Sequence, residues 1–109
     1  MSATYAGVIV VLTNLPDRES ALKLAGLLVD QRLAACVNVL SECTSVYRWR
    51  GQVETASEVP VLIKTAAASY RKLEAAIRAN HPYELPEIVS VPVVDGLAPY
   101  LEWVAAETA

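Results

Sequence analysis

The order of apolar and amphipathic segments is the feature that most constrains how this chain can fold. The unbroken apolar run from Val8 to Leu12 is rich in β-branched side chains, which is typical of a strand buried on both faces. Helical and extended patterns then alternate. The predicted elements are, in order, strand 8–12, helix 17–32, strand 35–39 continued by 45–49, strand 53–65 or 59–65, helix 69–80, strand 88–94 and a closing helix around 100–104.

This order is β-α-β-β-α-β followed by a helix, and Arg50-Gly51-Gln52 has the character of a hairpin turn. We therefore predict an α+β fold, a ferredoxin-like split βαβ sandwich whose four-stranded antiparallel sheet carries helices on one face. The chain shows neither linker nor repeat, so residues 1–109 are expected to form a single domain. Such an architecture hosts enzymes, regulators and RNA binders, so it does not define the function.

Individual positions give sharper expectations for the same elements. Asp17 is expected to cap the first helix and Ser69 the second. Pro60 cannot donate a ladder hydrogen bond, so it is expected at a bulge or near the start of its strand. A bulge or bend is also predicted at residues 41–44 of the preceding strand. The helical spacing predicts two inward faces, Leu22, Ala25, Val29 and Leu33 in the first helix and Tyr70, Leu73 and Ile77 in the second.

The chain is more apolar than a domain of its size can conceal. It has 109 residues, of which 54% are hydrophobic and only 19% charged. Because a small domain has a high ratio of surface to volume, we expect an apolar patch to be buried against other copies of the chain. The net charge of −3 and the absence of any basic run argue against nucleic acid as the main partner.

The expected location is the cytoplasm. The longest apolar run is far too short to span a bilayer, so no membrane association is expected. The first positive side chain is Arg18, which leaves no basic start for a signal peptide. Cys36 and Cys43 lie in one extended segment, too far apart for a local disulfide unless the chain folds back, and free thiols suit a reducing compartment.

The segment from His81 to Glu87 is the strongest candidate for a functional site. It holds the only histidine, two prolines and the carboxylates Glu84 and Glu87, between a helix and an apolar strand. Histidine is the commonest metal ligand, and the prolines give the turn a rigid backbone. A purely structural interpretation stands beside this one, in which the prolines stop the helix and the histidine caps it.

Four blocks of sequence resemble one known family. They are LAACVN at 33–38, SVYRWRG at 45–51, LIKT at 62–65 and HPYELPEI at 81–88. In this order and spacing they are similar to the divalent-cation tolerance proteins called CutA, and the similarity runs from about Val8 to Val104. The resemblance implies a ferredoxin-like fold and a tight homotrimer with sheet edges paired between subunits. The hairpin 35–65 would then be an arm that reaches a neighbour.

The resemblance also implies a role in copper and divalent-metal tolerance, with no established catalysis and no required cofactor. Copper ligands in metal-binding members are attributed to a cysteine at the end of the first strand and to two histidines before Pro-Tyr. Here those positions hold Thr13, Asn80 and His81, of which only His81 is a good ligand. The remaining expectation is weak binding of Cu(II) or another divalent cation by His81 with Glu84 or Glu87.

A second expectation concerns a cleft between subunits. Its predicted members are Cys36, Tyr47, Trp49, Arg50, Lys64 and Tyr83. The aromatic rings would offer stacking surfaces, and the two cations would suit a small anionic ligand. The structural alternatives are an interface core for the rings and a small buried hydrophobe for Cys36, both of which the residue types favour, and a salt bridge from Lys64 to Glu58, Glu84 or Glu87.

Two functions are expected for this chain. The first is a trimeric, metal-responsive binding protein. The alternative is a regulatory trimer, similar to the PII signalling proteins, that binds a small anionic metabolite between its subunits. An enzyme such as an acylphosphatase is not expected, because the chain has no glycine-rich phosphate loop and no recognisable nucleophile set.

Overall fold

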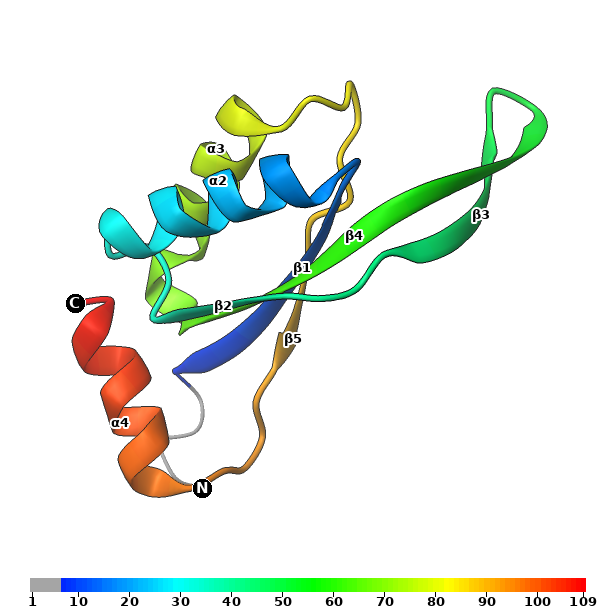
Figure 1. The fold of residues 1–109 in the computed structure, drawn as a ribbon. Coiled ribbons are helices and arrows are strands. Elements are labelled where there is room, and N and C mark those ends of the chain that lie inside the picture. The colour runs from blue at the N-terminus through cyan, green and yellow to red at the C-terminus, as the bar shows by residue number, and fades with distance from the viewer. Residues whose placement is uncertain (1–6) are drawn as a thin grey trace.

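The computed structural model describes residues 7–109 and contains an antiparallel sheet with three α-helices packed around it (Figure 1). The predicted α+β class is confirmed. The strands are β1 (Val8–Leu15), β2 (Cys36–Val39), β3 (Cys43–Trp49), β4 (Gln52–Ala66) and β5 (Val89–Pro92). The helices are α2 (Arg18–Asp30), the short 3-10 turn η1 (Ala67–Ser69), α3 (Tyr70–Asn80) and α4 (Ala98–Glu107).

The strand order across the sheet is β2-β4-β1-β5, and every pairing is antiparallel. Strand β3 pairs with the other half of β4, so the sheet has five strand segments where four were expected. The reason is that the second predicted strand is divided into β2 and β3, as its predicted bend indicated. Strands β2 and β5 lie at the two edges.

The division between β2 and β3 is a bulge. Val39 pairs with Val61 whereas Cys43 pairs with Glu58, so three residues of the break lie opposite two residues of β4. Pro60 is one of those two, and its carbonyl accepts a backbone N–H from the break at 3.0 Å. The bulge predicted for Pro60 is confirmed, and it lies in the interior of a strand of 15 residues rather than near its start.

Beyond the bulge, β3 and the first half of β4 form a two-stranded arm, residues 43–58, which extends away from the helices (Figure 1). The arm gives the molecule a longest dimension of 44 Å. Its turn has Arg50 at φ +50° and Gly51 at φ +82°. Two successive left-handed residues match the right-handed twist of a hairpin, which agrees with the predicted turn.

Helices α2 and α3 cover one face of the sheet (Figure 1) and enclose the core. The inward face of α2 differs from the prediction. Its buried residues are Ala21, Leu24 and Leu28, while Leu22 and Val29 are 50% and 44% exposed. The segment is apolar around most of the helix, so spacing alone did not identify the stripe that packs. In α3 the expected Leu73 and Ile77 are buried.

Side-chain contacts at the ends of the helices help to hold the helices in place. Asp17 caps α2 as predicted, since its carboxylate accepts the backbone N–H of Ser20 at 2.7 Å. Ser69 makes no cap and instead donates to the carbonyl of Thr108 at 3.4 Å. Helix α4 lies at the end of the sheet away from the arm (Figure 1) and buries Leu101 and Val104 beside Val8.

Candidate functional site

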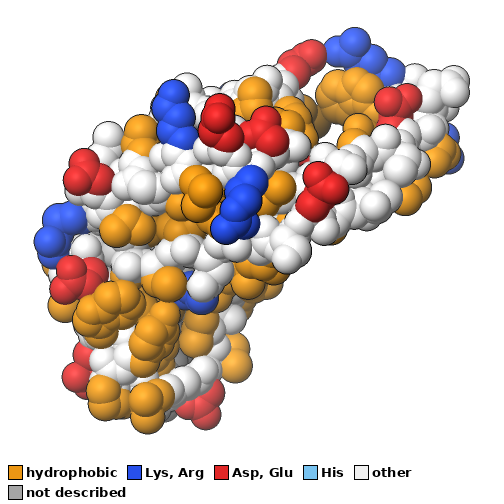
Figure 2. Space-filling view, viewed as in Figure 1, with side chains coloured by type: hydrophobic (Ala, Val, Ile, Leu, Met, Phe, Trp, Pro, Cys, Tyr) orange, Lys and Arg blue, Asp and Glu red, His pale blue; other side chains and the backbone are white. Residues whose placement is uncertain are grey.

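A groove of about 1170 Å³ lies between the arm and the segment 82–89. We call it the arm groove. Figure 2 shows this face of the molecule hollowed between the arm and the body. Its volume is sufficient for a small-molecule ligand. Its aromatic and charged lining residues are Tyr47, Trp49, Arg50, Glu58, Tyr83, Glu84 and Glu87.

Strand alternation builds the first wall of the groove. Side chains at every second position of a strand share a face, so Tyr47 and Trp49 of β3 project on the same side. Strand pairing aligns Cys43 of β3 with Glu58 of β4, and the same alternation brings Glu58 to the face of Tyr47. The second wall is the proline-containing turn that follows α3. Segments that lie more than 20 residues apart in sequence thus meet across the groove.

An ion pair joins the two walls. Arg50 Nη2 lies 3.0 and 3.1 Å from the two carboxylate oxygens of Glu84. The guanidinium of Arg50 also lies over the ring of Trp49, 5.1 Å from its centroid. Both charged side chains are about two-thirds exposed or more, at 69% and 70%, and such surface pairs contribute little to stability. The ion pair therefore connects the two walls of the groove but contributes little to the stability of this arrangement.

Glu58 is the most unusual charged group of the groove. It is only 9% exposed, and no salt bridge to it is formed by any residue in the range 7–109. Burial, assisted by the nearby Glu58 carboxylate, raises the pKa of Tyr83 to about 12.

The groove holds three carboxylates, those of Glu58, Glu84 and Glu87, against the single guanidinium of Arg50. Its net charge is therefore negative.

His81 has both ring nitrogens occupied. Its Nε2 lies 2.6 Å from the backbone carbonyl of Asn14, which can only accept, so Nε2 carries the proton. Its Nδ1 accepts the backbone N–H of Tyr83 at 3.2 Å. Burial lowers the pKa of His81 below 6.5, partly offset by the Asn14 carbonyl and the Glu58 carboxylate. The ring is thus a neutral imidazole with no free lone pair.

The other predicted metal ligands, Glu84 and Glu87, are held by other contacts, and the residues at the two remaining family positions, Asn80 and Thr13, are bonded to the backbone or buried. Glu84 pairs with Arg50, and Glu87 accepts the side-chain amide of Asn14 at 3.0 Å. Asn80 donates to the carbonyl of Ala76 at 2.8 Å. Thr13 is buried, and its hydroxyl has no hydrogen-bond partner among the described residues.

Within residues 7–109, no three His, Cys, Asp or Glu side chains come together as a group able to hold a metal ion. Copper prefers imidazole and thiolate ligands. The residues present in this arrangement therefore do not fit a closed copper site.

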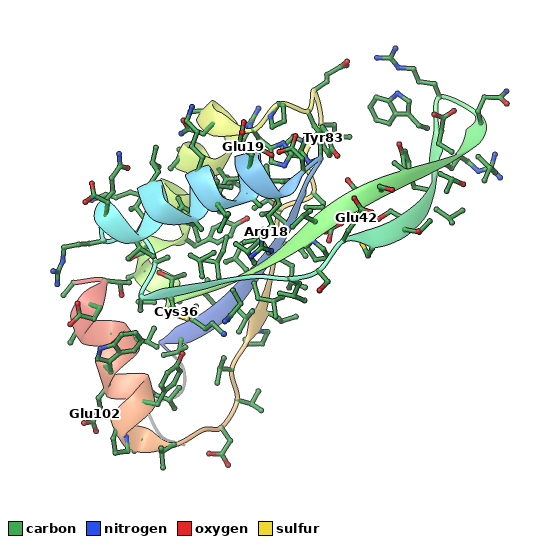
Figure 3. All side chains as sticks on the ribbon, in the orientation of Figure 1. Arg18, Glu19, Cys36, Glu42, Tyr83 and Glu102 are labelled. Carbon is green, nitrogen blue, oxygen red and sulfur yellow. The ribbon has the colours of Figure 1, made fainter. Side chains whose placement is uncertain are left out.

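The predicted cleft residues fall into two groups. Tyr47, Trp49, Arg50 and Tyr83 all line the arm groove. Cys36 and Lys64 are cross-strand partners elsewhere in the sheet, and both contact the side-chain oxygen of Asn38. Figure 3 shows Cys36 and Tyr83 at opposite ends of the sheet.

Lys64 therefore cannot act with Arg50 in one site of a single chain. Along β4 it lies ten residues from Glu54, the partner of Tyr47, which corresponds to roughly 33 Å of strand. The partner of Lys64 is Asn38, not one of the three glutamates considered from sequence. The sequence predicts Glu58 only as a partner for Lys64, whereas the strand pairing and side-chain alternation place it on the face of Tyr47.

A match to a protein-family model identifies the family of this chain. Residues 9–107 match the family model described as CutA1 divalent ion tolerance protein. This chain belongs to the CutA1 family. The divalent-cation tolerance protein CutA of Thermus thermophilus is 43% identical over 99 residues, which cover 91% of this chain and 96% of the relative. The resemblance stated from sequence is confirmed.

Solved structures support the same assignment. The divalent cation tolerance protein from Thermus thermophilus superposes with a TM-score of 0.92 at 42% identity, covering 94% of this chain and 99% of that chain. The chloroplastic Protein CutA of Arabidopsis thaliana is 41% identical over 100 residues, but the match spans 92% of this chain and only 55% of that CutA relative. Within residues 7–109, none of the CutA1 helices has the length and apolar character needed to cross a membrane.

Proposed function

We propose that this CutA1 protein acts in tolerance to divalent cations, as a cytoplasmic homotrimer that binds cations in the arm groove without catalysis. The observation that carries the proposal is Glu58, a nine-tenths buried carboxylate that faces a groove of negative net charge, accepts a hydrogen bond from the Tyr83 hydroxyl and has no cationic partner among residues 7–109. Burial of a carboxylate is offset by hydrogen bonds and by positive charge, and a bound cation would supply the charge. The name of the Thermus relative, a divalent-cation tolerance protein, supports the same role.

The groove chemistry favours cations that prefer oxygen ligands. Glu58 and Glu87 offer carboxylate oxygens, which are the typical ligands of Mg²⁺ and Mn²⁺ sites, whereas protein copper sites are usually built with imidazole or thiolate. His81 would have to give up its hydrogen bonds to Asn14 and Tyr83 before it could bind copper. We therefore propose Mg²⁺ or Mn²⁺, and not the copper expected from the family resemblance, as the metal ion bound in the groove.

The alternative function, binding of a small anion, has less support. Arg50 is already neutralised by Glu84, and Lys64 lies away from the groove. An anion entering the groove would face the carboxylates of Glu58 and Glu87. A site formed with a second subunit would have to supply the missing positive charge.

The homotrimer is proposed from uncovered apolar surface. Strand β5 is exposed along its whole length at an edge of the sheet, with Val89 and Val91 about half exposed. Exposed edges with apolar side chains favour pairing with another chain. Further apolar side chains, among them Leu97 and Trp103, gather at the surface around α4 (Figure 2).

Calorimetric titration tests the cation site. MnCl₂ and CuCl₂ are titrated into tag-free protein at pH 7.4, using the wild type, Glu58→Gln, His81→Gln and the control Glu102→Gln on the exposed face of α4. We expect weak, saturable Mn²⁺ binding that is lost in Glu58→Gln and retained in the other two variants. Micromolar Cu²⁺ binding that disappears in His81→Gln and at pH 5.5 would instead assign the site to His81.

A further inference from the structure

We propose that Asp95 is a site of spontaneous covalent modification, at which the aspartate converts to isoaspartate through a cyclic succinimide formed with Gly96. The two residues lie in the connection between β5 and α4, at the end of the sheet away from the arm (Figure 1). The cation-binding role proposed above uses neither residue. The modification is therefore independent of that role.

The reaction joins the backbone nitrogen of Gly96 to the side-chain carboxyl carbon Cγ of Asp95. A bond forms between nitrogen and Cγ, and the hydroxyl of the protonated carboxyl leaves with the amide proton as water. Water then opens the five-membered ring at one of its two carbonyl groups. Opening at Cγ restores aspartate. Opening at the main-chain carbonyl of Asp95 gives isoaspartate, in which the backbone runs through Cγ.

The connection between β5 and α4 already brings the reacting groups together. The backbone N–H of Gly96 donates to Oδ1 of Asp95 at 2.9 Å, so Cγ, one bond from that oxygen, lies beside the attacking nitrogen. This N–H makes no backbone hydrogen bond within residues 7–109, and both residues are exposed outside the helices and strands. Groups held close together in one chain react faster than separate molecules do. The ring can therefore close without breaking any secondary structure.

Packing against α4 favours glycine at position 96. A Cβ built on Gly96 would lie 3.3 Å from both Cδ1 and Cδ2 of Leu101, which is closer than ordinary van der Waals contact. Leu101 is buried beside Val8 and Val104, so its side chain has little room to move away. A glycine also leaves the approach of the nitrogen to Cγ free of side-chain atoms. The packing of α4 thus keeps the residue after Asp95 in its most reactive form.

The other two aspartates of the chain provide an internal comparison. The carboxylate of Asp17 is held by the cap of α2, and an arginine follows it. Asp30 precedes Gln31, whose backbone N–H donates to the carbonyl of Leu27 at 3.0 Å. Neither aspartate has a free amide nitrogen and a glycine after it. We therefore expect isoaspartate to form first at Asp95.

Isoaspartate at position 95 would change the attachment of α4. It adds one methylene group to the backbone between β5 and the helix. Because Gly96 lies against Leu101, the longer connection must move either the glycine or the helix from its place. Helix α4 is held to the sheet through Leu101 and Val104 beside Val8. The modified protein should therefore exchange the backbone amides of residues 98–107 several-fold faster.

Ageing of the folded, full-length protein at 37 °C and pH 6.0 tests the site. Peptide mapping with electron-transfer fragmentation distinguishes isoaspartate from aspartate, which have the same mass. We expect the isoaspartate fraction at Asp95 to exceed that at Asp17 or Asp30 by about tenfold or more. Asp95→Glu is the matched control, because it keeps the charge but would have to close a six-membered ring, which forms far more slowly. Hydrogen exchange of α4 is measured on the same samples before and after ageing.

The results separate the site from its structural effect. Isoaspartate at Asp95 together with faster exchange in α4, both absent from aged Asp95→Glu, supports the whole proposal. Equal isoaspartate fractions at the three aspartates overturn the site. Isoaspartate at Asp95 with unchanged exchange in α4 overturns the effect on helix packing. Faster exchange in aged Asp95→Glu as well would assign the loosening of α4 to another cause.

Discussion

The Nε2 atom of His81 donates a hydrogen bond to the backbone carbonyl of Asn14, 2.6 Å away, and so ties the turn after α3 to the end of β1. On the other side of the ring, Nδ1 accepts from the backbone N–H of Tyr83. The two bonds fix the backbone that carries Tyr83 into the arm groove. His81 is therefore a positioning residue for one wall of the groove, which is a structural reason for a histidine at this place.

The lowered pKa of His81 predicts a loss of stability in mild acid. The unfolded chain takes up a proton near pH 6.5, whereas the buried imidazole takes it up only at lower pH. Its contribution to the free energy of unfolding is thus complete above pH 6.5 and falls as the pH decreases through the folded pKa. Denaturant unfolding between pH 8 and pH 5 measures this decrease.

His81→Gln is the control for that measurement, because the glutamine amide can still donate to Asn14 but does not titrate. His81 is the only histidine, so the variant should show a flatter dependence between pH 6.5 and pH 5. An equally steep decrease in the variant would show that other groups cause it. NMR titration of the imidazole should give a midpoint below 6.5 in the folded protein.

Two buried threonines on paired strands predict opposite effects of the same substitution. The Thr13 hydroxyl is buried without a partner among residues 7–109, while Thr65 Oγ1 donates to the carbonyl of Leu33 at 2.7 Å. Thr13→Val should stabilise the protein by about 1 kcal/mol, because it removes an unsatisfied polar group. Thr65→Val should destabilise it by about 1 kcal/mol, because it leaves a carbonyl unpaired. Chemical denaturation of both variants tests the pair, and equal signs would contradict it.

The sequence predicted the order of elements because their periodicities are distinct. It left the packing face of α2 undetermined, since residues 21–29 are apolar on most sides and only packing selects Leu24 and Leu28 over Leu22. The full length of β4 was also open, because Pro60 suggested a strand start. The bulge opposite Pro60 allows the strand to continue through it.

The site was predictable in part. Tyr47, Trp49, Arg50 and Tyr83 were grouped from sequence, and the arm groove brings these four together. The separation of Lys64 from them depends on the strand register, which single residues do not reveal. The two hydrogen bonds of His81 depend on Asn14, 67 residues away, so no local pattern could have indicated that the ring is fully engaged.

The turn of the arm predicts a second pair of opposite effects. Gly51 has φ +82°, where a side chain is strained, so Gly51→Ala should cost roughly 1 kcal/mol. Arg50 has φ +50°, which asparagine tolerates better, so Arg50→Asn should favour the hairpin backbone. Amide hydrogen exchange in residues 43–58 measures both effects locally. Slower exchange in Gly51→Ala would contradict the left-handed turn.

The exposed edge of the sheet predicts the site of self-association. Val91 is half exposed on β5, so Val91→Lys would place a charge at the proposed contact between chains. Leu22→Lys is the matched control, because Leu22 is equally exposed but lies on the outer side of α2. Light scattering at micromolar concentration should give three times the 11.8 kDa chain mass for the wild type and the control. Val91→Lys should give a smaller mass and a lower melting temperature, while the wild-type melting temperature should fall on dilution. A wild-type monomer would contradict the homotrimer, and a trimeric Val91→Lys would place the contact elsewhere.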